Sequence, residues 1–160
     1  MEAFLRPIEK KDNAAMQMIV KKSLEEFGLD RPGTAYFDPE LEDLTQAYNQ
    51  EKAGYWVLEL AGGVIGGVGV FPHVEKDGRS VAEMQKLYID RDFRGRGFAR
   101  PLIEQAIAFA RENYDALYLE TSSDLQVDRL YEHFNFQKLD GPVDGGVHPA
   151  MDLWYIMNFD

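Results

Sequence analysis

Four arginines and two glycines lie within twelve consecutive residues, in the segment RDFRGRGFARPL at positions 91–102. Arginine pairs with phosphate oxygens through parallel N–H donors, and glycine lets an anion approach the backbone closely. The segment runs directly into IEQAIAFAREN, which has the apolar spacing of a helix. Because the first amides of a helix lack intrahelical partners and attract anions, we predict a phosphate-binding site here.

Other interpretations of this segment stay open. It lacks the lysine and hydroxyl of a P-loop and the three-glycine pattern of a dinucleotide-binding turn, so it is neither common nucleotide motif. The Arg-Gly-x-Gly pattern alone also fits a solvated turn with flanking charge. The strand-like KLYID at residues 86–90 precedes it, and an order of strand, loop and helix favours the anion site.

Hydrophobic spacing predicts the elements that must position this segment. We expect helices at residues 12–27, from Asp38 to about 48, from 97 or 98 to 113, and at 125–134. We expect strands at 55–61, 64–71, 81–89, 116–121, 136–139 and 151–159. Gly62 and Gly63 are expected to form a hairpin turn, residues 73–80 a loop, and Asp38 the cap of its helix. This order indicates a mixed α/β fold.

Composition limits the classes of protein that are possible. The 160 residues are 45% hydrophobic, include no cysteine and carry a net charge of −11. We expect one domain spanning residues 1–160, without disulfides or a thiol intermediate. The negative charge argues against a nucleic-acid partner, and no apolar stretch approaches the ~18 residues that a membrane span needs. The expectation is a cytoplasmic protein.

Charge is unevenly distributed along the chain. Residues 86–100 contain five basic and two acidic side chains, whereas residues 23–53 contain two basic and eight acidic ones. The first region suits an anionic ligand and the second a cationic one.

The arginine and glycine segment resembles the Gln/Arg-x-x-Gly-x-Gly/Ala motif of the GCN5-related N-acetyltransferase (GNAT) family, with Arg94, Gly97 and Ala99 at the matching positions. KLYID and the later LYEHFNF also resemble family segments, and the resemblance extends over about residues 3–158. It implies a single-domain α/β fold with a mixed central sheet of about six to seven strands. The family sheet splays between its fourth and fifth strands and is flanked by about four helices.

The sequence departs from the family pattern at two positions. Asn135 replaces the usual glycine after the fourth helix, and asparagine is the commonest substitute where a helix ends in the left-handed conformation. Asp124 stands where many members have an asparagine that often touches the cofactor, so the residue's role is open.

The resemblance implies acetyl-CoA as the acyl donor and an amine as the acceptor. The pyrophosphate of acetyl-CoA would lie on the amides from Gly95 to Arg100, and its pantetheine arm would lie along the backbone of the preceding strand. The implied cofactor-binding residues are Leu87, Tyr88, Ile89, Arg94, Gly95, Arg96, Gly97, Phe98, Ala99, Arg100 and Asp124.

The resemblance also implies direct transfer to the amine in a ternary complex, which requires a base and an acid. Tyr131 aligns with the family tyrosine that protonates the departing thiolate, although it also lies on an apolar helix stripe with Val127 and Phe134. Glu83 precedes Leu87 by four residues, as the catalytic glutamate does in several members. It could equally be an exposed strand carboxylate, with a water chain as the base.

The acceptor is less constrained. In the family the first two helices form a wall of the acceptor site, and their acidic residues here favour a cationic small molecule or a lysine-rich peptide. Acidic helices could also serve solubility alone. His148 lies in a loop that often borders the acceptor pocket in this family.

Competing functions are a non-catalytic acyl-CoA sensor and a nucleotide-phosphate-binding protein of unrelated fold. We expect no metal, because histidines and carboxylates show no ligand spacing. The oligomeric state is left open: dimers are common in the family, and the strand at 151–159 could mediate a homodimer here.

Overall fold

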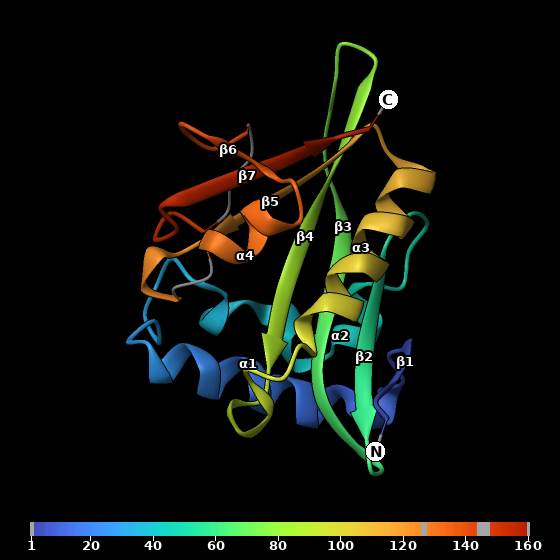
Figure 1. The fold of residues 1–160 in the computed structure, drawn as a ribbon, viewed down its shortest axis with the longest axis vertical. Coiled ribbons are helices and arrows are strands. Elements are labelled where there is room, and N and C mark those ends of the chain that lie inside the picture. Colours follow the sequence, from blue (N-terminus) through green and yellow to red (C-terminus); the bar gives the residue numbers. More distant parts are fainter. Residues whose placement is uncertain (1, 126–127, 144–147, 160) are drawn as a thin grey trace.

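A computed structural model describes residues 2–125, 128–143 and 148–159. Its centre is one seven-stranded sheet in the order β1-β2-β3-β4-β5-β7-β6 (Figure 1). The strands are β1 (Phe4–Pro7), β2 (Gly54–Leu60), β3 (Gly63–Lys76), β4 (Arg79–Ile89), β5 (Ala116–Thr121), β6 (Gln137–Leu139) and β7 (Leu153–Asn158). The α-helices are α1 (Asn13–Glu26), α2 (Leu44–Ala47), α3 (Ala99–Asn113) and α4 (Asp128–His133). The predicted α/β fold is confirmed.

Two tight turns join β2, β3 and β4 into the expected meander. The first consists of Ala61 and Gly62, with φ 52° and 84°, so the predicted turn at Gly62 and Gly63 was displaced by one residue. The second consists of Asp77 and Gly78, with φ 56° and 76°. Such turns match the twist of the strands they join. The prediction of a loop at 73–80 was wrong, because this Asp-Gly turn lets both strands continue to it.

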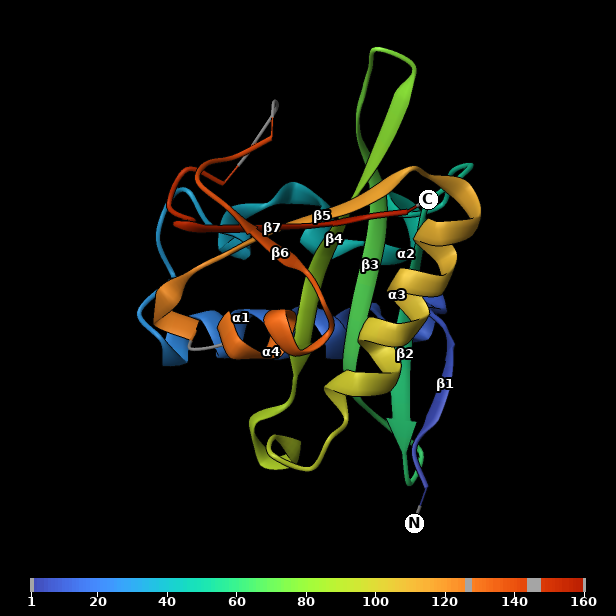
Figure 2. The same cartoon turned by 45° about the horizontal axis from the view of Figure 1, so that its top comes forward.

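The sheet opens between β4 and β5, as predicted. These parallel strands pair only where Val81–Glu83 of β4 meet Ala116–Tyr118 of β5. Beyond that point the two strands diverge, which both ribbon views show (Figures 1 and 2). The backbone of the last part of β4 therefore borders a gap instead of a neighbouring strand.

An irregularity in β4 lies beside this gap. Lys86 has φ 51°, an uncommon conformation for a residue with a side chain, and the pairing of β3 with β4 shifts register there. The buried hydroxyl of Tyr55 donates a 2.8 Å hydrogen bond to the Lys86 carbonyl oxygen. The bulge is thus held from β2, two strands away across the sheet.

Helices cover both faces of the sheet. On α3 the buried side chains recur at helical spacing and pack, with Tyr131 of α4, on one face: Leu102, Ile103, Ala106 and Ala110. On α1 the corresponding residues are Met16, Ile19, Val20 and Leu24, which pack on the other face. Burying each such large side chain contributes ~1.5–3 kcal/mol, so these stripes fix both helices against the sheet.

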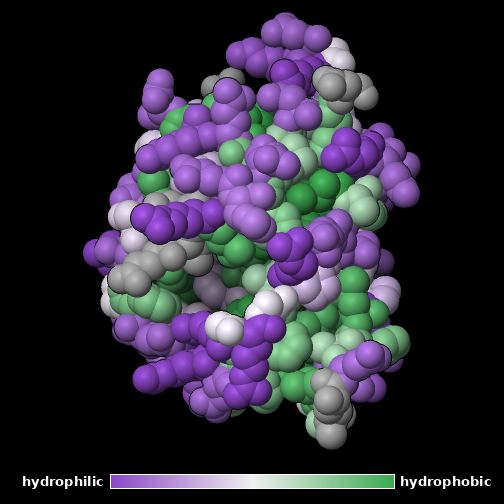
Figure 3. All heavy atoms as spheres, in the orientation of Figure 1, coloured by the Kyte–Doolittle hydropathy of each residue, from purple (hydrophilic) through white to green (hydrophobic). Residues whose placement is uncertain are grey.

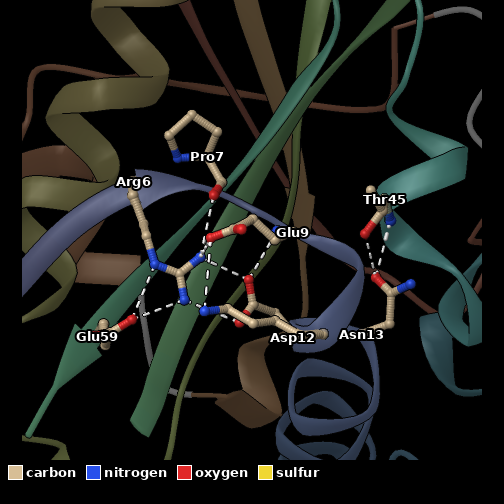
Figure 4. Close-up of polar contacts among 8 residues, drawn as sticks. Arg6, Pro7, Glu9, Asp12, Asn13, Thr45 and Glu59 are labelled. Atoms are coloured by element: carbon tan, nitrogen blue, oxygen red, sulfur yellow. Dashed lines mark hydrogen bonds and ion pairs between the residues drawn. The ribbon is translucent and has the colours of Figure 1, made fainter. Parts of the chain in front are cut away.

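The N-terminal strand β1 was not predicted, because four residues carry too little pattern. Arg6 on β1 binds the carboxylate of Asp12 through Nη1 at 2.7 Å and Nη2 at 3.0 Å, and its Nε donates to Glu59 of β2 at 3.0 Å (Figure 4). Asp12 is only 4% exposed and also accepts the backbone amide of Glu9 at 2.8 Å. Burial alone would raise the pKa of Asp12, but the Arg6 guanidinium lowers it overall. This cluster ties β1 and β2 to the start of α1.

The predicted second helix is divided into a 3-10 turn at Pro39–Glu42 and the single turn α2. Its apolar stripe of Leu41, Leu44 and Tyr48 is buried as predicted. Asp43, and not Asp38, caps α2 by accepting the Gln46 amide. Asp38 stands at the N-cap position of the 3-10 turn, as predicted, but its carboxylate makes no capping hydrogen bond because it binds other residues described below.

Candidate active site

A cavity of about 480 Å³ opens at the splay of the sheet. It is bordered by the end of β4, the loop before α3, α4, and Ser23 and Phe27 at the end of α1. Figure 3 shows the surface hollowed left of centre, between the positions of α1 and α4 in Figure 1. Most predicted site residues border it, namely Leu87, Tyr88, Ile89, Arg94, Gly95, Gly97, Phe98, Ala99, Arg100 and Tyr131.

The loop before α3 has the backbone geometry of an anion site. Gly95 and Gly97 have φ 76° and 81°, which favour glycine over any residue with a side chain. The amides of residues 95–98 find no acceptor within the described part of the chain. These amides and the start of α3 combine free donors with the positive end of a helix of fifteen residues.

The three arginines of the motif are placed differently. Arg94 donates to the Ile89 carbonyl at 2.9 Å, to Glu26 at 3.0 Å and to Ser23 at 2.9 Å, so it joins the loop to α1. Arg96 and Arg100 are exposed, and their guanidinium groups lie over the rings of Phe93 and Phe134. Arg100 borders the cavity and Arg96 lies in the loop beside it, so both can add positive charge near the free amides, whereas Arg94 fixes the loop.

Asp124 lies in the 3-10 turn Ser123–Leu125 and is exposed. It is not among the residues that border the cavity, and its backbone amide donates to the Ser122 hydroxyl at 3.1 Å. The neighbouring residues 126–127, including Val127 of the predicted apolar stripe, lie outside the described residues.

Tyr131 is held rigidly at the cavity wall. Its ring packs on Phe136 and Tyr155, at centroid distances of 5.9 and 5.7 Å, and its side chain is 6% exposed. Burial raises the pKa of the phenol, so its hydroxyl is protonated at neutral pH. Asn135 ends α4 with φ 71°, and the Phe136 amide bonds back to the Tyr131 carbonyl at 3.1 Å. The prediction for Asn135 is confirmed.

Glu83 borders a second cavity of about 440 Å³ and not the one that contains Tyr131. It is buried, receives a 2.7 Å hydrogen bond from Gln85 and lies 3.7 Å from Nδ1 of His73. Burial raises the pKa of Glu83, although Gln85 and His73 oppose the shift. A carboxyl with a raised pKa suits proton transfer near neutral pH.

Sequence reasoning missed a charged cluster that includes Lys86, which borders the first cavity, and Glu40, which borders the second. Nζ of Lys86, at the β4 bulge, lies 3.0 Å from Asp38 and 3.5 Å from Glu40. Nε2 of His148 lies 2.8 Å from the same Asp38 carboxylate. Burial alone would raise the pKa of Asp38, but His148 and Lys86 lower it overall. Only the position of His148 before the last strand hinted at this cluster, since Asp38 precedes His148 by 110 residues.

The Asp38 cluster joins segments that are distant in the chain. Besides the His148 contact, the Ala150 amide donates to the Gly33 carbonyl at 3.1 Å. Burial alone would lower the pKa of His148, but Asp38 raises it overall. The segment before β7 is thereby fastened to the loop between α1 and α2.

Within residues 2–125, 128–143 and 148–159, no group of three histidine or acidic side chains could hold a metal ion. None of the helices in this part of the chain is both long and apolar enough to cross a membrane.

The splayed sheet, the amides before α3 and the buried tyrosine define the acetyltransferase class of fold and site. The profile of the acetyltransferase (GNAT) family matches residues 17–136, and the chain belongs to this family. An uncharacterized N-acetyltransferase, YjgM of Escherichia coli (strain K12), is 35% identical over 158 residues, covering 93% of this chain and 94% of that protein. N-acetyltransferase 8B of Rattus norvegicus is 32% identical over 74% of this chain, which spans about half of that protein, 52%.

Solved structures share the fold at lower identity. A GNAT-family acetyltransferase from Staphylococcus aureus Mu50 superposes with a TM-score of 0.84 at 16% identity. The superposition covers 99% of this chain and 100% of that protein. YncA of Salmonella typhimurium, described as a putative acetyltransferase with its cofactor acetyl-CoA, gives 0.75 at 20% identity over 99% and 94% of the two chains.

Proposed function

We propose that the protein transfers an acetyl group from acetyl-CoA to a primary amine by direct attack within a ternary complex. The observation that carries the proposal is that one cavity is bordered by the free edge of β4, the amides before α3 and Tyr131. A structural neighbour of the same fold is described with acetyl-CoA as its cofactor.

The residues present fit this donor. Amides 95–98 and the start of α3 would hold its pyrophosphate, and Arg96 and Arg100 would add charge. An added Cβ at Gly95 or Gly97 would meet nothing within 4 Å, so a ligand can approach the backbone there. Leu87, Tyr88 and Ile89 would bind the pantetheine arm as an added strand. Contact of Asp124 with the cofactor stays a prediction, because Asp124 is not among the residues that border the cavity.

Acetyl-CoA supplies the reactive thioester when it is bound. Tyr131 donates a proton to the departing sulfur, a role that its raised pKa supports. Glu83 accepts a proton from the amine through water, since it borders the second cavity and not the one that Tyr131 borders. As the new C–N bond replaces the C–S bond, the ammonium nitrogen loses two of its three protons; the departing sulfur gains one proton, and one is released to solvent. No covalent enzyme intermediate is required.

A cationic acceptor is supported by part of the acidic region only. Glu40 and Glu83 border the second cavity together with the aromatic side chains of Tyr48 and Phe71. Glu40 also pairs with Lys86 at 3.5 Å, and Glu83 accepts from Gln85 at 2.7 Å. Two acidic residues of α1 are engaged elsewhere: the Tyr36 hydroxyl donates to Glu25, and Glu26 pairs with Arg94. The acceptor would enter along the face that carries Glu40.

An assay of CoA release tests the proposed function. Because the chain has no cysteine, a thiol-reactive dye reads free CoA without a protein background. We expect turnover with at least one of spermidine, an aminoglycoside, an amino acid or a lysine-rich peptide, and stronger activity of polycations at low salt. CoA binding without turnover of any amine would instead favour an acyl-CoA sensor.

Calorimetry separates the remaining alternative. We expect heat of binding with CoA and none with ATP, whereas a nucleotide-binding protein predicts the reverse. Residues 1–160 as a single domain, a cytoplasmic location and a homodimer through β7 stay predictions; gel filtration of the purified protein tests the last.

A further inference from the structure

Glu120 lies on β5, directly beyond the point where β4 and β5 stop pairing. It borders the same cavity as Tyr131. Its Oε1 is buried and has no hydrogen-bond partner within the described residues, and it is the one side-chain polar atom in that part of the chain for which this holds. A buried acceptor without a partner is costly, and such atoms in folded proteins call for an explanation.

The rest of the carboxylate is held in place. The Tyr118 hydroxyl donates to Oε2 of Glu120 at 2.8 Å and in turn accepts the Val143 amide at 3.2 Å. The Tyr118 ring is stacked on His73 at a centroid distance of 4.9 Å. With Oε2 occupied by Tyr118, the carboxylate is oriented and Oε1 is left for another donor.

The chemistry of this position suits a cation. Glu83 lies opposite Tyr118 in the β4–β5 register, so Glu83 and Glu120 lie on the same face of the sheet at the splay. The charge of Glu120 contributes to the raised pKa of Glu83, after the larger effect of burial. An ammonium group between them would relieve this repulsion and supply the missing N–H donor.

We propose that Glu120 binds the protonated amine of the acceptor, with Oε1 accepting an ammonium N–H beside Tyr131. The inference rests on the proposed function and deepens it: the acceptor is a primary alkylammonium compound. Glu120 determines specificity by positioning the nitrogen, and Glu83 remains the group that takes its proton. Neutral hydroxyl compounds lack both the charge and the strong donors that this carboxylate requires.

The variant Glu120→Gln tests the proposal in the full chain, because glutamine is isosteric and keeps an oxygen for the Tyr118 hydroxyl. With n-butylamine, 1,4-diaminobutane and spermidine as probes, we expect the KM for the amine to rise about 10- to 100-fold, the range of a lost charge-assisted hydrogen bond. The KM for acetyl-CoA should stay within about twofold. Glu120→Asp, which keeps the charge, should restore part of the affinity.

Glu112→Gln is the matched control, since Glu112 is an exposed carboxylate on α3 that does not border the cavity. It should leave both KM values unchanged. An unchanged amine KM in Glu120→Gln, or an equal loss of acetyl-CoA affinity, would overturn the inference. CoA binding by the unmodified protein without acetylation of any of the three amines would overturn it as well. Absence of CoA binding would instead refute the proposed function itself.

Discussion

Replacing Tyr131 with phenylalanine is the sharpest test of the proposed chemistry. The ring would keep its contacts with Phe136 and Tyr155, so the substitution removes the proton donor and leaves the cavity wall in place. A positioned general acid contributes about 10²- to 10⁴-fold to the rate, which corresponds to ~3–5 kcal/mol of activation free energy. We therefore expect kcat to fall by that factor while both KM values change little.

The structure also predicts that Tyr131→Phe costs little stability. The Tyr131 hydroxyl makes no hydrogen bond to another described residue, so no internal bond is lost. The melting temperature should fall by less than about 4 °C, the shift expected for ~1 kcal/mol in a chain of this size. Tyr114→Phe provides the opposite control, because the Tyr114 hydroxyl donates to the Lys52 carbonyl at the far end of α3. It should lower stability by ~1 kcal/mol and leave kcat unchanged.

The pH profile adds an independent check. Since burial raises the pKa of Tyr131 above its ordinary value of 10.0, the acid form persists throughout the range from neutral pH to pH 10. The unmodified enzyme should lose no activity from this group in that range. The reasoning would be refuted by a Tyr131→Phe variant that retains kcat within about threefold, measured as CoA release at saturating acetyl-CoA.

Three further predictions concern stability, cofactor binding and pH. Asp12→Ala should destabilise the protein by ~2–4 kcal/mol in urea titrations at pH 7, because it leaves the nearly buried Arg6 guanidinium with fewer partners. Since the folded-state pKa of Asp12 is lowered below its ordinary 3.8, this contribution is complete above about pH 4 and is lost as pH falls through the lowered value. Gly97→Ala should weaken CoA binding about 5- to 20-fold by calorimetry, because φ 81° strains alanine by ~1–2 kcal/mol and shifts the amides. Because the folded-state pKa of His148 is raised above 6.5, its ion pair with Asp38 stabilises fully below that pH and is lost as pH rises through the raised value.

Each of these has a clear contrary result. A difference between the Asp12→Ala and unmodified proteins that stays constant down to pH 2 would exclude the assigned ion pair. Gly62→Ala, at a distant turn with φ 84°, controls for general strain and should leave CoA affinity intact. For the ion pair of His148 with Asp38, the His148→Gln variant should have a lower free energy of unfolding than the unmodified protein at pH 5.5. This difference should shrink by pH 8.5, and an equal difference at both pH values would contradict the prediction.

The sequence by itself determined the long elements and the position of the anion loop. The apolar residues of α1 and α3 recur at helical spacing, and such a stripe must be buried whatever covers it. Gly95 and Gly97 could be identified because the positive φ of a loop that ends at a helix is a local requirement. The identity of Asn135 as a helix end follows from the same local geometry.

The tertiary structure alone decided which charges meet. Arg94 stands at a motif position that predicts a phosphate ligand, yet its N–H groups donate to Glu26 and Ser23 of a helix about seventy residues earlier. Asp38 has the sequence of a helix cap, yet it binds His148, and the unpartnered oxygen of Glu120 follows from where two strands separate. Spacing along a chain records neighbours within an element, whereas ion pairs and orphaned acceptors depend on how distant elements pack, and no local pattern contains that information.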